Sequence, residues 1–123
     1  MKAFILVAVF LGAVTADVIF YTTADDNLNM QAVVDDPVKL QSYVDCFLDR
    51  KPCDPIPASY KEIIPDSIET GCKRCNPAQK RLANTFLIGL KKKLPKEYQR
   101  FLAKYDPTGK FIEKFLQRVE GHW

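Results

Sequence analysis

Apolar residues recur at helical spacing along most of the chain, and the clearest stripe lies in its first half. Between residues 36 and 48 they fall at positions i, i+3, i+4, i+7 and i+8, which places them on one face of a helix. Asp36 suits the N-cap of this helix, and Pro37 suits its first turn, because a proline there loses no backbone hydrogen bond. The buried face is expected to carry Leu40, Tyr43, Val44, Phe47 and Leu48. A shorter helix is predicted ahead of it, capped and lined by Asn27, Leu28, Ala32 and Val33.

The next predicted helix begins near Ser59. Ser59 and Glu62 have the spacing of a capping box, and Gly71 is placed to end the helix in a left-handed conformation. Pro65 lies inside this segment, where it removes one backbone hydrogen bond. The apolar stripe of the helix consists of Tyr60, Ile63, Ile64 and Ile68.

Three further helices are predicted in the second half of the chain. Asn76 and Pro77 open the first, and the lysines 91–93 followed by Pro95 close it. A turn at residues 106–109 separates the last two. No segment shows sustained strand alternation, so the predicted fold class is all-α, a single globule of about six short amphipathic helices. The stripes of these helices are Leu82, Phe86, Leu87 and Leu90; Tyr98, Phe101, Leu102 and Tyr105; and Phe111, Ile112, Phe115, Leu116 and Val119.

The N-terminus has the pattern of a secretory leader. Lys2 precedes an apolar run from Ala3 to Val14, and small residues up to Ala16 suit signal peptidase. The run is shorter than the roughly 20 apolar residues that span a bilayer, so a signal peptide over residues 1–16 is expected. A buried N-terminal helix is the alternative. The mature chain, residues 17–123, is then expected to be one secreted, extracellular domain without stable membrane insertion.

Charge and residue content argue against nucleic-acid binding and against catalysis. The 18 basic and 15 acidic residues are interspersed and give a net charge of +3, unlike the clustered basic surface that phosphate backbones require. Histidine occurs once, at His122 beside the C-terminus, so no imidazole is placed to activate a serine or to bind a metal. We therefore expect no catalytic residue, no metal site and no cofactor.

The chain has four cysteines, with six, 18 and two residues between successive members. The gap between Cys46 and Cys53 is too wide for a usual zinc-ligand pair, and no predicted strand leads into Cys72 and Cys75, as a thioredoxin-type redox motif requires. An even number of cysteines after a leader therefore indicates structural disulfides. Four cysteines allow three pairings, and these arguments do not choose among them.

The predicted helices carry more apolar surface than a minimal core needs. Plain core packing explains most of it, but a surplus of rings with a phenolic rim can also enclose a pocket that has apolar walls and a few polar groups. The aromatic residues on the predicted inward faces are Tyr43, Phe47, Tyr60, Phe86, Tyr98, Phe101, Tyr105, Phe111 and Phe115.

Short motifs accompany the cysteine spacing in a fixed order along the mature chain. They are Tyr21-Thr22-Thr23, Asn27-Leu28, Tyr43-Val44-Asp45-Cys46, Leu48-Asp49, Pro65-Asp66, Gln79-Lys80 and Lys104-Tyr105-Asp106-Pro107-x-Gly109. Taken together with the cysteines, this ordered set resembles the insect chemosensory proteins, or OS-D-like family.

The resemblance implies six helices around a hydrophobic channel for long-chain ligands, with disulfides Cys46–Cys53 and Cys72–Cys75. It implies ligand contacts at Tyr43 and at Tyr98, which stands where many members have tryptophan. The predicted stripes extend this set of ligand contacts to Leu40, Val44, Phe47, Ile63, Ile64, Ile68, Leu82, Phe86 and Leu90.

Two functions remain open from the sequence. The first is a monomeric carrier whose partner is a small hydrophobic ligand, such as a semiochemical, a fatty acid or a derivative of one. The second is a secreted developmental or defence factor that acts through a protein or membrane partner. The second has only the mild positive charge and the lysines in its favour, and a soluble carrier needs those as well.

Overall fold

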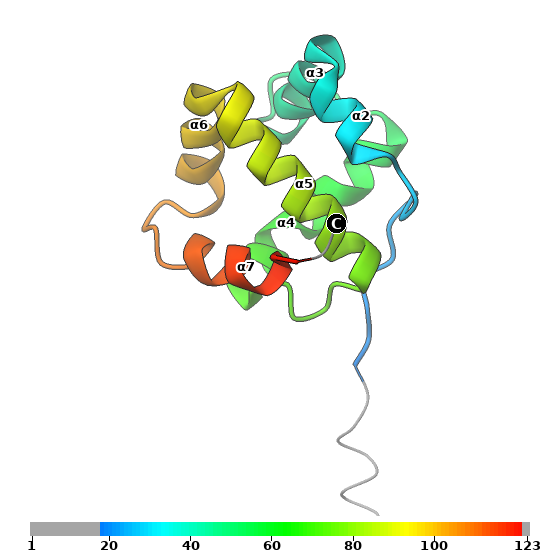
Figure 1. The fold of residues 1–123 in the computed structure, drawn as a ribbon, viewed down its shortest axis with the longest axis vertical. Helices are drawn as coiled ribbons and strands as arrows, with labels where there is room; N and C mark the ends of the chain where they lie inside the picture. Colours follow the sequence, from blue (N-terminus) through cyan, green and yellow to red (C-terminus); the bar gives the residue numbers. More distant parts are fainter. Residues whose placement is uncertain (1–17, 122–123) are drawn as a thin grey trace, which may run out of the picture.

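A computed structural model describes residues 18–121, so the predicted leader and its cleavage after Ala16 lie outside the described residues. Six helices and no strand make up the described part of the chain (Figure 1), which confirms the all-α prediction. The helices are α2 (Met30–Asp35), α3 (Pro37–Phe47), α4 (Pro55–Thr70), α5 (Pro77–Lys93), α6 (Pro95–Tyr105) and α7 (Ile112–Val119).

Proline begins four of these helices, and side-chain caps fix two of the predicted starts. One carboxylate oxygen of Asp36 accepts hydrogen bonds from the amides of the first turn of α3. At the start of α5, the Asn76 side chain accepts from the amide of Gln79, and the Gln79 side chain accepts from the amide of Asn76. This reciprocal capping box satisfies two amides that have no partner within the helix.

The predicted starts of two other helices are wrong. Helix α4 begins at Pro55 rather than near Ser59, because the prolines at 55 and 57 fit its first turn without loss of a hydrogen bond. Ser59 therefore lies inside α4, where its hydroxyl donates to the carbonyl of Ile56 at 2.7 Å. Helix α2 is capped by Asn29 rather than Asn27. Two other predictions for α4 are confirmed. Pro65 lies inside the helix, and Gly71 ends it with a left-handed φ of 68°.

Helix α5 is central in the arrangement. Figure 1 shows it running diagonally across the molecule, with α6 on one side and with α2 and α3 on the other. Helix α5 packs against α2, α6 and α7, whereas α4 packs against α3, α6 and α7. Helices α4 and α5 thus form facing walls that the other helices join. The most deeply buried side chains of the core include Leu40, Val44, Leu90, Phe115 and Val119.

Both disulfides are local, as the resemblance implied. Cys46 is bonded to Cys53 and Cys72 to Cys75, so all four cysteines are paired. The first bridge joins the end of α3 to the loop before α4, and the second closes the loop between α4 and α5. Because each bridge spans a few residues only, the helices are held to one another by side-chain packing and not by crosslinks.

A buried carboxylate joins α6 to α3 and to the loop that follows α3. Glu97 is 7% exposed, and its two carboxylate oxygens accept hydrogen bonds from the two terminal nitrogens of Arg50, at 2.6 and 2.9 Å. Gln41 and Arg100 donate to the same carboxylate at 2.9 and 2.6 Å. The hydrogen bonds from Arg50 are the largest of the effects that lower the pKa of Glu97 to about 2.

Candidate functional site

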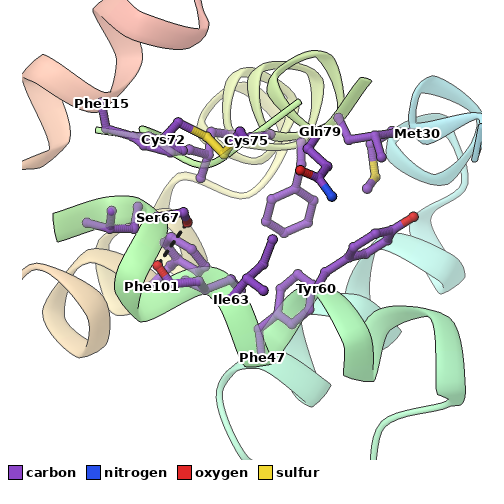
Figure 2. A pocket seen from close by; sticks show the side chains of 16 residues that line it. Met30, Phe47, Tyr60, Ile63, Ser67, Cys72, Cys75, Gln79, Phe101 and Phe115 are labelled. Atoms are coloured by element: carbon purple, nitrogen blue, oxygen red, sulfur yellow. Dashed lines mark hydrogen bonds between the residues drawn. A yellow bond between two sulfur atoms is a disulfide. The ribbon is translucent and has the colours of Figure 1, made fainter. Parts of the chain in front are cut away.

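An apolar cavity lies between α4 and α5. Each helix contributes side chains at positions i, i+3, i+4, i+7 and i+8 of its inner face, counted from Tyr60 in α4 and from Gln79 in α5. One residue from each of the other four helices and the second disulfide complete the lining (Figure 2). The lining residues are Met30, Phe47, Tyr60, Ile63, Ile64, Ser67, Ile68, Cys72, Cys75, Gln79, Leu82, Ala83, Phe86, Leu87, Phe101 and Phe115.

The structure brings together six of the eleven ligand contacts expected from the sequence. Phe47, Ile63, Ile64, Ile68, Leu82 and Phe86 line the cavity. Leu40, Tyr43, Val44, Leu90 and Tyr98 do not line it. Leu40, Val44 and Leu90 are at most 1% exposed and belong to the core that surrounds the cavity.

The two tyrosines that the resemblance singled out lie outside the cavity wall. The ring of Tyr43 meets the ring of Phe47 edge-on, with centroids 6.0 Å apart, so it stands one residue away from the lining. Tyr98 is buried, and the ammonium of Lys91 lies 5.8 Å from its ring centroid. Burial raises the pKa of both hydroxyls.

Sequence reasoning missed several lining residues, and Phe111 was placed wrongly. Gln79 and Ala83 follow the same helical spacing as Leu82 and Phe86, but a polar and a small residue do not stand out in an apolar stripe. Phe111 does not point inward: it sits at the N-cap position of α7 and is 37% exposed. The hydrogen bonds that its amide makes with Asp106 fix this start of α7.

Apart from the disulfide, three lining residues carry polar side chains, and all three are engaged within the protein. The Tyr60 hydroxyl donates to the carbonyl of Asp25, and burial raises its pKa. The Ser67 hydroxyl donates to the carbonyl of Ile64 at 3.0 Å. The side-chain nitrogen of Gln79, Nε2, donates to the carbonyl of Tyr21 at 2.9 Å. Among the residues described, no charged side chain lines the cavity, so its wall suits an uncharged, apolar molecule.

Two features are absent from residues 18–121. No group of three or more His, Cys, Asp or Glu side chains there is arranged to hold a metal ion. No helix in that range has the length and apolar character needed to cross a membrane.

Several known proteins are similar to this chain in sequence. Allergen Tha p 1 of Thaumetopoea pityocampa is 31% identical over 100 residues, which are 81% of this chain and 79% of that protein. Ejaculatory bulb-specific protein 3 of Drosophila melanogaster is 28% identical over the same shares of the two chains. Residues 21–113 match the insect pheromone-binding family, A10/OS-D.

Two solved structures are similar as well. A chemosensory protein in complex with bromo-dodecanol has a TM-score of 0.72 and 35% identity, over 80% of this chain and 98% of that one. The antennal chemosensory protein A6 of the moth Mamestra brassicae has a TM-score of 0.65 and 34% identity, over 76% of this chain and 87% of that one. The six helices, the two local disulfides and the apolar cavity define a chemosensory protein. The chain belongs to the insect pheromone-binding family A10/OS-D, as its cysteine spacing and ordered motifs predicted.

Proposed function

We propose that the protein is a secreted, monomeric carrier that binds small, elongated hydrophobic molecules in the cavity between α4 and α5. Residues 1–16 serve as the signal peptide and residues 17–123 form the mature carrier. The observation that carries this proposal is the cavity wall itself, which among the described residues has no charged side chain. The related chemosensory protein in complex with bromo-dodecanol supports a long-chain, weakly polar ligand.

The size of the cavity implies that the walls separate when such a ligand enters. The cavity offers about 80 Å³, which is about half the volume of an apolar cavity of roughly 150 Å³ that binds benzene. A chain of 12 to 18 carbons, the range we expect, therefore has to displace flexible side chains such as Met30 and Leu82. Each methylene that it buries contributes about 0.8 kcal/mol, so ten give about 8 kcal/mol before the costs of association and of opening the walls.

Expansion of the cavity would also bring its neighbours into contact with the ligand. Tyr43 lies against Phe47, which lines the wall, and pairs an apolar ring with a hydroxyl that can orient a polar end. We infer the same role for Tyr98. Leu40, Val44 and Leu90 would form the second layer of an expanded channel.

Filling the cavity tests the proposal. Ala83 lines the wall from α5, and leucine at this position adds an isopropyl group to the space that the ligand needs. We expect delipidated wild-type protein to bind 1-dodecanol with micromolar affinity, measured by displacement of N-phenyl-1-naphthylamine. Ala83→Leu is expected to weaken that binding at least about tenfold, because the ligand must give up the contacts of two or more buried methylenes.

Ala103→Leu is the matched control. Ala103 is exposed on α6 and does not line the cavity, so the same substitution there is expected to leave the affinity unchanged. Circular dichroism of all three proteins checks that the helices are intact. If folded wild-type protein takes up no alcohol, ester or acid of 12 to 18 carbons, the carrier proposal fails and a protein or membrane partner becomes the better hypothesis.

A further inference from the structure

An extended segment crosses one end of the space between α4 and α5. Residues 21–26, which we call the N-terminal strap, precede α2 and contain no helix. Residues 22 and 24 are exposed, and the other four are half-buried. The amide of Tyr21 donates to the carbonyl of Arg74 in the α4–α5 loop at 3.0 Å. The strap therefore begins at that loop and runs toward α2 (Figure 1).

Two side chains that line the cavity also hold the strap. The side-chain nitrogen of Gln79, Nε2, donates to the carbonyl of Tyr21 at 2.9 Å and to the hydroxyl of Thr23 at 3.0 Å. The Tyr60 hydroxyl donates to the carbonyl of Asp25. Figure 2 shows Tyr60 and Gln79 together with Met30 at one end of the cavity, with Phe115 at the opposite end. The strap is thus fastened to the wall of the cavity itself.

Further polar contacts fasten the strap to both walls. On the α4 side, the hydroxyl of Ser59 accepts the amide of Ala24 at 3.0 Å. On the α5 side, the side-chain nitrogen of Asn76, Nδ2, donates to the carboxylate of Asp26 at 2.9 Å. At this end of the cavity the strap therefore bridges α4 to α5 through hydrogen bonds to both helices.

From this arrangement we propose that the N-terminal strap is the gate of the cavity, and that ligands enter and leave where it bridges α4 and α5. This inference rests on the proposed carrier function. The strap is held mainly by hydrogen bonds near the surface, which water can replace as it opens, whereas the remaining walls are apolar side chains packed between helices. Opening would also free the donors of Tyr60 and Gln79, which could then meet an oxygen of the incoming ligand.

A gate has a kinetic signature that a binding contact lacks. A weaker strap opens more often in both the free and the loaded protein, so the association and dissociation rate constants rise together. The equilibrium affinity then stays nearly constant. A residue that only contacts the ligand changes the dissociation rate and the affinity together.

Ser59→Ala and Thr23→Val test this signature, since neither residue lines the cavity. Ser59→Ala loses one strap hydrogen bond, whereas Thr23→Val loses two, those of the Thr23 hydroxyl with Gln79 and with Asp26. Stopped-flow mixing with N-phenyl-1-naphthylamine is expected to show both rate constants raised about fivefold in Ser59→Ala and by at least as much in Thr23→Val. The dissociation constant is expected to change less than twofold. Tyr105→Phe is the control. It also removes one hydroxyl, which donates to the backbone carbonyl of Phe47 at 2.6 Å, but neither residue belongs to the strap. Unchanged rates in both strap variants, or equal changes in the control, would overturn the gate.

Amide hydrogen exchange tests the opening without any ligand. The amides of Tyr21 and Ala24 are expected to exchange at least about a hundredfold faster than the core amides of α5, and faster still in Ser59→Ala. If these two amides exchange as slowly as the core amides of α5, the strap does not open separately from the core, and the gate proposal is overturned. If wild-type protein binds no probe, the carrier function fails, while hydrogen exchange still decides whether the strap opens.

Discussion

Replacing Gly89 by alanine is expected to lower the free energy of unfolding by about 2 kcal/mol, although alanine ordinarily favours a helix. Gly89 lies buried in α5 where α2 crosses it. A Cβ atom there would lie 2.4 and 2.9 Å from the two methyl carbons of Val34, closer than carbon atoms pack. Val34 is β-branched and held in a helix, so it has no second rotamer into which it can retreat easily. The overlap thus outweighs the gain of roughly 1 kcal/mol in helix propensity.

Removing the methyl groups of Val34 tests this explanation. In the double variant Gly89→Ala, Val34→Ala the two closest contacts are gone, so it is expected to be at least about 1 kcal/mol more stable than the sum of the single changes predicts. Gly109→Ala serves as the control. Gly109 has a φ of 71°, and a Cβ atom added there would meet no atom within 4 Å beyond its chain neighbours. The cost of Gly109→Ala therefore comes from the backbone alone, and Val34→Ala should not relieve it. Urea unfolding followed by circular dichroism measures the three single variants and the two double variants that combine Val34→Ala with Gly89→Ala or with Gly109→Ala. A Gly89→Ala protein as stable as wild type would refute the clash.

The helices could be predicted well because their signals are local. Asp36 and Pro37 begin α3, and Gly71 ends α4, through contacts within a few residues along the chain. The same local signals misled at Ser59, where a serine followed three residues later by glutamate resembles a capping box. In the structure Ser59 accepts an amide from the strap, 35 residues away in sequence, and no local pattern encodes that contact.

The site could be predicted only in part for a similar reason. Helical spacing identifies the inner face of α5, but it does not distinguish a wall of the cavity from the solid core. Phe86 lines the cavity, whereas Leu90, one turn later on the same face, is fully buried within the core. Gln79 belongs to the site because the strap folds back onto it, a contact that spans 58 residues.

Glu97→Gln is expected to lower the free energy of unfolding by about 2 to 3 kcal/mol at neutral pH. The carboxylate is nearly buried and accepts hydrogen bonds from Arg50, Arg100 and Gln41. Glutamine keeps one oxygen, but it turns an NH₂ group toward arginine donors and removes the counter-ion that Arg50 and Arg100 share. Arg50 keeps its ion pair with Asp45 at 3.0 Å. The estimate is kept below the cost of breaking a fully buried pair, because the side chains of Arg50 and Arg100 are 40% and 57% exposed.

The same substitution is expected to flatten the acid dependence of stability. The pKa of Glu97 is lowered to about 2 from its ordinary value of 4.5, so its ionised form is favoured by folding. That stabilisation is complete above about pH 4.5 and is lost as the pH falls toward 2. Unfolding by urea at several pH values in this window should therefore show a smaller decrease for Glu97→Gln than for wild type. Some decrease remains, because hydrogen bonds from Lys104 and Lys61 lower the pKa of Asp49 to about 2 as well.

Glu62→Gln supplies the control for this last prediction. Glu62 is exposed on α4, so the same loss of one negative charge there is expected to leave the stability at neutral pH unchanged. An equal slope in Glu97→Gln and wild type would mean that the carboxylate is not favoured by its arginine partners. A loss of stability in Glu97→Gln that is the same at pH 2.5 as at pH 7 would instead trace the effect to packing, because most of the stabilisation that comes from the ionised carboxylate is already lost at pH 2.5.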